Sequence, residues 1–241
     1  MTKIFFLIIL PFCFSTQEYS GVNYKPRSLT NAQQWALGVS GVLASRNHMK
    51  FDSLAGEDRN IYAIQHEKKL LKEWWNIENK KDLLKDLEWL KNEGHSAEFN
   101  KFKKLLVSKQ WQTNLKEKLE NKDPEFKYKI AVVRKYQDFL DNKSLYGWDV
   151  ARYICLCRWG YLCGYLTEED AWEKIMPAAR FAQKTFDSWE NLGKNYLIGR
   201  EFWSPQNDGR YIYEDTYMRL LEAPESPWKK LPWNLSLDEE K

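Results

Sequence analysis

The sequence predicts an all-helical fold, a single globular domain of many helices without a substantial sheet. From Ser28 onward almost every segment repeats its apolar residues at helical spacing, and no segment alternates strictly between apolar and polar residues. Helix start signals also recur, and the clearest is Asp123-Pro124-Glu125, where a capping residue precedes a proline and an acid. The 241 residues, of which 43% are apolar and 29% charged, suffice for one sizeable core or at most two small ones.

In the first half of the chain, helices are expected over residues 31–45 and 58–75, with Ser28 or Thr30 as the cap of the first. A third helix opens at Asn79 and stops at Gly94. Its apolar face consists of four leucines, whereas lysine and aspartate fill the opposite face: Leu83, Leu84, Leu87 and Leu90. The same spacing continues beyond Gly94 through several phenylalanines and leucines.

In the second half, helices are expected after Asp123, over residues 148–161, after Thr167 and over residues 211–221. Thr167 followed by Asp170 resembles a capping box, so the acids at 168–170 stabilise a helix start rather than form a catalytic pair. Pro177 should kink or split the helix that they begin, because proline lacks the amide hydrogen of a helix interior.

The two ends of the chain differ from its middle. Lys3 followed by the apolar run 4–14 predicts a signal peptide over residues 1–15, since the run is shorter than the roughly 20 residues that span a bilayer. The alternative is an uncleaved amphipathic or buried N-terminal segment. An irregular lead-in should cover residues 16–27, the helical domain residues 28–223, and a Pro/Trp-containing tail residues 224–241. That tail either lies along the domain or forms an arm.

Charge and cysteine content narrow the class of protein. The net charge of +3 and the mixed signs between residues 68 and 143 argue against nucleic-acid binding. Cleavage near Ser15 predicts export to the periplasm or the extracellular space, with no transmembrane span afterwards. Cys155, Cys157 and Cys163 are expected to be small buried residues, although a Cys157–Cys163 bridge stays open. The histidines have no metal-ligand spacing, so neither a metal nor a cofactor is expected.

The candidate chemistry centres on one charged pair and one histidine. Asp149 and Arg152 lie three residues apart, so on a helix they share a face, where they either bind an anionic ligand or form an architectural ion pair. His95 after Gly94 is either a general base or a residue of the turn between two helices. Arg200, which precedes Phe202 and Trp203, either stacks on aromatic rings, binds an anion or closes a helix end.

The tryptophans suggest sugar stacking, but most of them follow apolar helical stripes, and core burial accounts for them better. Ser188 lacks the flanking glycines of a nucleophile elbow and is expected to be a cap or turn residue. The residues expected to specify a tertiary nucleus are four tryptophans, two glycines and one serine: Trp75, Trp148, Gly164, Trp172, Ser188, Trp189 and Gly199.

A succession of short motifs carries a family resemblance: Trp75-Asn76-Ile77, Gly94-His95, Trp148-Asp149-x-x-Arg152, Gly160-Tyr161, Gly164-Tyr165, Ala171-Trp172, Ser188-Trp189 and Tyr196-Leu197-x-Gly199-Arg200-x-x-Trp203. As an ordered set over residues 70–203, they resemble a bacterial family of domains of unknown function, number 1266. The resemblance implies a bacterial helical domain and no assigned activity.

These observations favour an exported, non-enzymatic protein that binds another protein or a component of the bacterial cell envelope, in an oligomeric state that the sequence does not specify. The residues expected to form its binding surface are two arginines and three tryptophans: Arg152, Arg200, Trp203, Trp228 and Trp233. One alternative is an envelope hydrolase or toxin-like enzyme whose cleft gathers four polar side chains: His95, Asp149, Arg152 and Arg200. A second alternative is an immunity-type partner protein.

Overall fold

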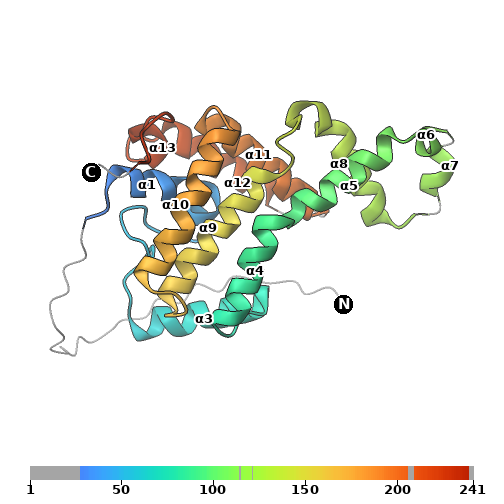
Figure 1. Cartoon of the computed structure of the whole chain (residues 1–241). Helices are drawn as coiled ribbons and strands as arrows, with labels where there is room; N and C mark the ends of the chain where they lie inside the picture. Colours follow the sequence, from blue (N-terminus) through green and yellow to red (C-terminus); the bar gives the residue numbers. More distant parts are fainter. Residues whose placement is uncertain (1–27, 114, 121, 206–208, 239–241) are drawn as a thin grey trace, which may run out of the picture.

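A computed structural model describes residues 28–113, 115–120, 122–205 and 209–238. The signal peptide and the lead-in predicted over residues 1–27 lie outside these ranges. Within them every regular element is a helix and no strand occurs, so the prediction of an all-helical fold is confirmed (Figure 1). None of the helices in these ranges is long and apolar enough to cross a membrane.

The helices follow one another in this order: α1 (Asn31–Gly38), α2 (Gly41–Arg46), α3 (Ile61–Trp75), α4 (Lys80–Asn92), α5 (Gly94–Val107), α6 (Lys109–Gln112), α7 (Leu115–Glu120), α8 (Pro124–Leu140), α9 (Tyr146–Leu162), α10 (Glu168–Thr185), α11 (Trp189–Trp203), α12 (Arg210–Glu222) and α13 (Pro227–Lys230). Helices α5 and α8 pack against each other and project to one side of the molecule, with α6 and α7 at the far end (Figure 1).

Side-chain caps begin several of these helices where the sequence predicts them. The Thr30 hydroxyl accepts from the amide of Gln33 at the start of α1, and Thr167 and Asp170 form a reciprocal capping box at the start of α10. Asp123 caps α8, with Pro124 in its first turn. Ser188 caps α11 through the amide of Asn191.

Three predicted helices differ from the observed ones. The helix expected over residues 31–45 is interrupted at residues 39–40, between α1 and α2. The one expected from residue 58 begins at Ile61, because the Asn60 side chain accepts from the amides of Tyr62 and Ala63. Of the two outcomes expected at Pro177, the split does not occur, because α10 continues through the proline and buries Ala171 and Ile175 before it and Ala179 and Ala182 after it.

Helix α9 is the centre of the fold. Nearly all of its residues are buried, and it packs against α10, α11 and α4 (Figure 1). A helix that is enclosed on all sides in this way belongs to a core rather than to a surface. Arg158 is fully buried within it and donates to the carbonyls of Lys50, Ser53 and Leu54, so it holds the loop before α3 in place. Cys155, Cys157 and Cys163 are buried free thiols, which confirms that interpretation over a disulfide.

Four tryptophans attach the C-terminal segment to the first helix, and we call them the tryptophan clasp: Trp35, Trp189, Trp228 and Trp233. Trp189 and Trp228 stack with ring centroids 5.6 Å apart. Each indole N–H donates to a backbone carbonyl, and the acceptors are Pro232, Leu231, Gly38 and Phe186 respectively. The described part of the tail therefore lies along the domain and contributes to its core.

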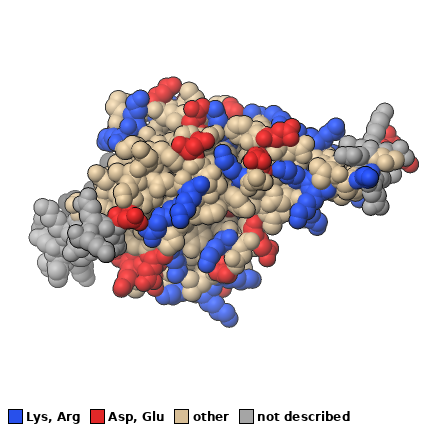
Figure 2. All heavy atoms as spheres, turned by 45° about the horizontal axis from the view of Figure 1, so that its top comes forward, with Lys and Arg blue, Asp and Glu red and all other residues tan. Residues whose placement is uncertain are grey.

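The surface carries mixed charge. On the face shown in Figure 2, lysine and arginine side chains lie among aspartates and glutamates, and neither sign forms a continuous area. Several of these charges are paired along single helices, as in Lys194–Glu190 of α11 and Arg210–Glu214 of α12. Exposed pairs of this kind contribute little to stability and do not form a binding site by themselves.

Candidate functional site

The Asp149 carboxylate of α9 lies at the N-terminus of α5. Its two oxygens accept from the amides of His95 and Ser96, both at 2.9 Å, and Oδ2 accepts from the Ser96 hydroxyl at 2.7 Å. Gly94 has φ of +53°, and a Cβ there would lie 2.4 Å from the carboxylate. A negative charge on free helix amides is stabilising, so Asp149 caps a helix that is distant in the sequence.

His95 lies between Asp149 and Arg152. Nη1 of Arg152 is 2.8 Å from Nδ1 of His95, and because a guanidinium only donates hydrogen bonds, Nδ1 must accept. Oδ1 of Asp149 is 3.5 Å from the same nitrogen, but it cannot accept a hydrogen bond from a nitrogen that carries no proton. The three side chains therefore do not form the Asp–His arrangement that orients a general base.

One expectation is corrected by this geometry. Asp149 and Arg152 do not form a direct ion pair, since no carboxylate of the described residues lies within 4.0 Å of Arg152. His95 does follow the turn between α4 and α5, as one of its two interpretations expects, and it also contacts both of these side chains and packs edge-on against Trp89 and Trp148. The spacing of residues 149 and 152 placed them on one helix face, but it could not reveal the ring inserted from α5.

Arg152 lines a cavity of about 430 Å³, which we call the aromatic pocket. It lies between α2, α3, α9, α11 and α12. Its wall consists of tryptophans and tyrosines, leucines, two arginines, one asparagine and one acid: Leu43, Asn47, Glu67, Leu70, Leu71, Trp74, Trp75, Trp148, Arg152, Trp159, Tyr196, Arg200, Trp203 and Tyr213. This volume and this largely apolar wall with a few convergent polar groups are typical of small-molecule sites.

Both arginines of the aromatic pocket lie against ring faces. The Arg152 guanidinium is 4.4 Å from the Trp75 centroid and 5.0 Å from that of Trp148, and Arg200 lies over Trp203 and Tyr213. Burial lowers the pKa of Arg152 to about 10, an effect that the nearby Asp149, Tyr196 and Asp86 partly oppose. Arg152 therefore stays positively charged near neutral pH.

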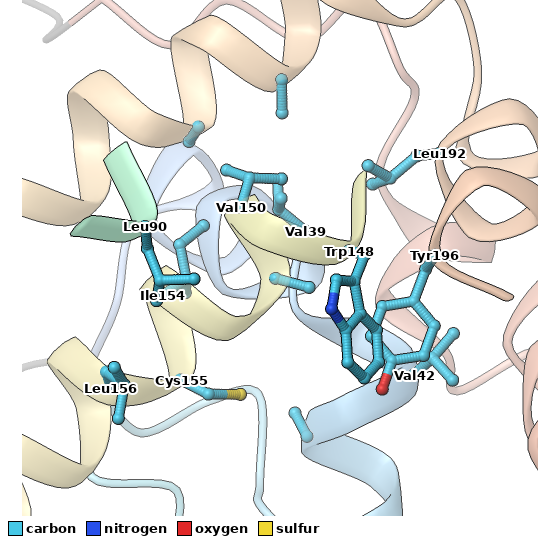
Figure 3. Packing of buried hydrophobic residues seen from close by; sticks show 14 of the residues in the cluster. Val39, Val42, Leu90, Trp148, Val150, Ile154, Cys155, Leu156, Leu192 and Tyr196 are labelled. Carbon is cyan, nitrogen blue, oxygen red and sulfur yellow. The ribbon is translucent and has the colours of Figure 1, made fainter. Parts of the chain in front are cut away.

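Two buried polar atoms belong to the wall of the aromatic pocket and have no hydrogen-bond partner among the described residues. They are Nε1 of Trp148 and the hydroxyl of Tyr196, whose side chains are only 4% and 2% exposed. Figure 3 shows these rings side by side, one from α9 and one from α11, with their centroids 5.0 Å apart. Unsatisfied buried polar groups are rare and costly, so two of them on adjacent residues of the wall set this part of the core apart.

The predicted site residues lie in three parts of the molecule: the aromatic pocket, the contact between α9 and the start of α5, and the tryptophan clasp. Arg152, Arg200 and Trp203 line the aromatic pocket, with Trp203 partly exposed at its edge. His95 and Asp149 do not line it, and Asp149 instead borders a larger cavity of about 740 Å³ between α4, α9 and α10. That second cavity contains none of the unpartnered buried atoms described above.

Trp228 and Trp233 were expected on a binding surface, and the structure places them elsewhere. Trp228 is buried in the clasp, and Trp233 is half-buried there with its N–H on a backbone carbonyl. The tail composition alone gave no way to distinguish an exposed strip from a packed one, because both are rich in proline and tryptophan.

The other residues expected to be structural have identifiable roles. Trp148 packs against Gly199, where a Cβ would lie 2.2 Å from that of Trp148, so a glycine is required for α11 to approach α9. Gly164, with φ of +77°, forms the turn after α9. Trp75 supports Arg152, and Trp172 is half-buried against the core.

Several pocket residues were not anticipated from the sequence, among them Glu67, Trp74 and Tyr213. Glu67 is buried, and this burial, together with Glu57, raises its pKa to about 7. Trp74 is 71% exposed. No local signal marks these residues, because the pocket forms where five helices meet. Within the described ranges, no cluster of three or more His, Cys, Asp or Glu side chains has a metal-binding arrangement.

Comparison with known proteins gives one result. The model of a family described as "Protein of unknown function (DUF1266)" matches residues 70–233, which is more than half of the chain and contains α4 to α13 together with most of the pocket wall. No curated protein and no solved structure matches the chain. The chain belongs to the DUF1266 family.

Proposed function

We propose that this chain is an exported, non-catalytic binding protein of the bacterial cell envelope, and that the aromatic pocket is its ligand site. The observation that carries the proposal is the composition of this pocket, where five tryptophans and two arginines line a single cavity. Tryptophan and arginine are the residues most enriched where binding energy is concentrated. A free ligand, or a group displayed by a larger envelope partner, would fit a cavity of this volume.

The arrangement around His95 supports binding over catalysis. A general base needs a free lone pair within reach of a substrate and a partner that orients its ring. The Nδ1 lone pair of His95 accepts from Arg152, while the Asp149 carboxylate is engaged by two amides and the Ser96 hydroxyl. These groups act as supports for α5 and for Arg152.

The binding proposal can be tested with phenylnaphthylamine, a neutral compound in which an amine joins a naphthalene to a phenyl ring. Its fluorescence rises in apolar surroundings. We expect saturable binding to one site and a loss of affinity of about fivefold or more in Trp203→Ala, since a ring face is removed from the edge of the pocket. Phe181→Ala is the matched control, because Phe181 is 45% exposed, like Trp203 at 44%, but lies on α10 outside the pocket. Absence of binding, or equal binding by both variants, would contradict the proposal.

The proposed export rests on residues 1–15, where Lys3 and an apolar run precede small residues. Mass spectrometry of the protein recovered from the envelope fraction of a bacterial host should give a chain that begins at Thr16. A cytosolic product that retains Met1 would contradict export and would leave the pocket proposal untouched.

A further inference from the structure

The positive charge of Arg152 has no direct counter-ion in the described part of the chain. The side chain donates to His95, a neutral ring nitrogen, and no described carboxylate lies within 4.0 Å of it. Burial of a charged group without an ionic partner is unfavourable, and burial is the main cause of the lowered pKa of Arg152. The protein thus maintains a partly buried cation at the wall of a cavity.

The orientation of this cation is fixed before any ligand binds. Trp75 and Trp148 present their ring faces to the guanidinium, and His95 engages Nη1. Asp149 in turn holds the backbone of His95 through its amide. A guanidinium held in this way keeps its other N–H groups in the planar fork that matches the oxygens of a carboxylate, phosphate or sulfonate, and it loses little entropy on binding.

The other polar groups of the wall favour the same kind of ligand. Arg200 brings a second positive charge from α11, and its guanidinium, like that of Arg152, can only donate hydrogen bonds. The single acid of the wall is Glu67, which is about half protonated at neutral pH because its pKa is near 7. The wall therefore offers donors and positive charge, and its repulsion of an anion is small.

The apolar part of the wall defines the remainder of the ligand. Trp74, Trp203 and Tyr213 present rings at or near the edge of the cavity, and Trp148 and Trp203 are inclined at 34° with centroids 6.0 Å apart. Flat ring systems pack well against such surfaces, whereas a small inorganic anion would leave most of the 430 Å³ without contacts.

We infer that the ligand of the aromatic pocket is a flat, ring-containing organic anion whose acidic group binds the Arg152 guanidinium while its rings lie among Trp74, Trp148 and Trp203. This inference rests on the proposed binding function and specifies its ligand class. Carboxylate, phosphate and sulfonate share the required chemistry, since each presents two or more oxygens to the guanidinium fork.

The test compares two probes that differ in one group. Anilinonaphthalene sulfonate is phenylnaphthylamine with an added sulfonate, so the ratio of their dissociation constants isolates the contribution of the anion. We expect the sulfonate to bind at least about tenfold more tightly to the wild-type protein. Arg152→Gln should reduce this ratio to about one, because any change in the pocket that affects both probes alike cancels in the ratio. Arg59→Gln is the control, because Arg59 also stacks on a ring, that of Tyr161, but lies outside the pocket.

Each outcome has a distinct meaning. Equal affinity for both probes, or a preference that survives Arg152→Gln, would overturn the inference about the anion while the binding proposal stands. Failure of both probes to bind would overturn the binding proposal itself. If circular dichroism shows that Arg152→Gln is unfolded, Arg152→Lys decides. Lysine keeps the charge but lacks the fork, so the preference should fall about threefold or more, and an unchanged preference would overturn the role of Arg152.

Discussion

The Asp149 carboxylate lies 2.7 Å from the Ser96 hydroxyl, and through this contact the central helix α9 caps the start of α5. The two residues are separated by 53 positions in the sequence, yet Asp149 does for α5 what a local N-cap does for other helices of the fold. The same carboxylate also accepts from the backbone amide of His95, and the His95 ring in turn accepts from the guanidinium of Arg152. The stability of the fold and the geometry of the proposed ligand site therefore depend on one carboxylate.

Replacement of Asp149 should strongly destabilise the protein. Asp149→Ala leaves the amides of residues 95 and 96 without acceptors, and we expect the free energy of unfolding to fall by about 2–4 kcal/mol. Ser96→Ala, which removes one hydrogen bond, should cost about 1 kcal/mol. Urea denaturation measures both values. Asp138→Asn on the exposed face of α8 is the control and should change stability by less than about 0.5 kcal/mol.

The tryptophan clasp should be essential for stability although it lies near the end of the chain. Trp228→Ala removes a buried ring that stacks on Trp189, and a loss of about 3–5 kcal/mol is expected. Trp228→Phe keeps an aromatic ring but leaves the Gly38 carbonyl without its donor, so a smaller loss of about 1–2 kcal/mol is expected. Thermal unfolding followed by circular dichroism would rank the variants, and a Trp228→Ala protein as stable as the wild type would exclude a structural role for the clasp.

Local sequence signals accounted for several helix starts. The caps at Thr30, Asp123, Thr167 and Ser188 were predictable because a capping residue, its acceptor geometry and the following apolar spacing all lie within one turn. The start of α5 was not predictable in this way, since its cap comes from Asp149. The break at residues 39–40 was also missed, because the apolar spacing continues through it.

The candidate site was only partly predictable for the same reason. Arg152, Arg200 and Trp203 stand out in the sequence because they follow one another among aromatic residues and glycines, and they do share the aromatic pocket. Glu67 and Trp74 come from α3, which is distant in the sequence from Arg152, Arg200 and Trp203. Within α3 alone, nothing in the residue spacing distinguishes them from residues on the surface of a helix. Their placement depends on how α3 crosses α9, which no local pattern specifies.

The three cysteines of the helical domain, Cys155, Cys157 and Cys163, should be inert in the folded protein. Burial raises the pKa of Cys155 and of Cys163 to about 12 and that of Cys157 still further, so the reactive thiolate is scarce near neutral pH. Iodoacetamide at pH 8 should therefore label none of them in the native state and all three in guanidinium, as counted by mass spectrometry. Rapid labelling of the native protein would show that α9 opens locally or that a thiol is accessible.

Glu67 should make stability depend on pH. Its pKa is about 7 in the folded protein and 4.5 for an ordinary glutamate, so between these values the folded state holds a proton that the unfolded state has released. The contribution of Glu67 to stability therefore falls as pH rises from 4.5 to 7, by at most roughly 3 kcal/mol at about 1.4 kcal/mol per pH unit.

Glu67→Gln removes this titration and keeps the shape of the protonated side chain. The variant and the wild type should have similar stability at pH 4.5, while at pH 8 the variant should be the more stable by up to roughly 3 kcal/mol, as measured by urea denaturation at both values. Glu73→Gln, on the exposed face of the same helix, should show no such divergence. A Glu67→Gln protein that is less stable than the wild type at pH 8 would mean that the charged carboxylate is favoured in the fold, and the acid of the pocket wall would then oppose an anionic ligand.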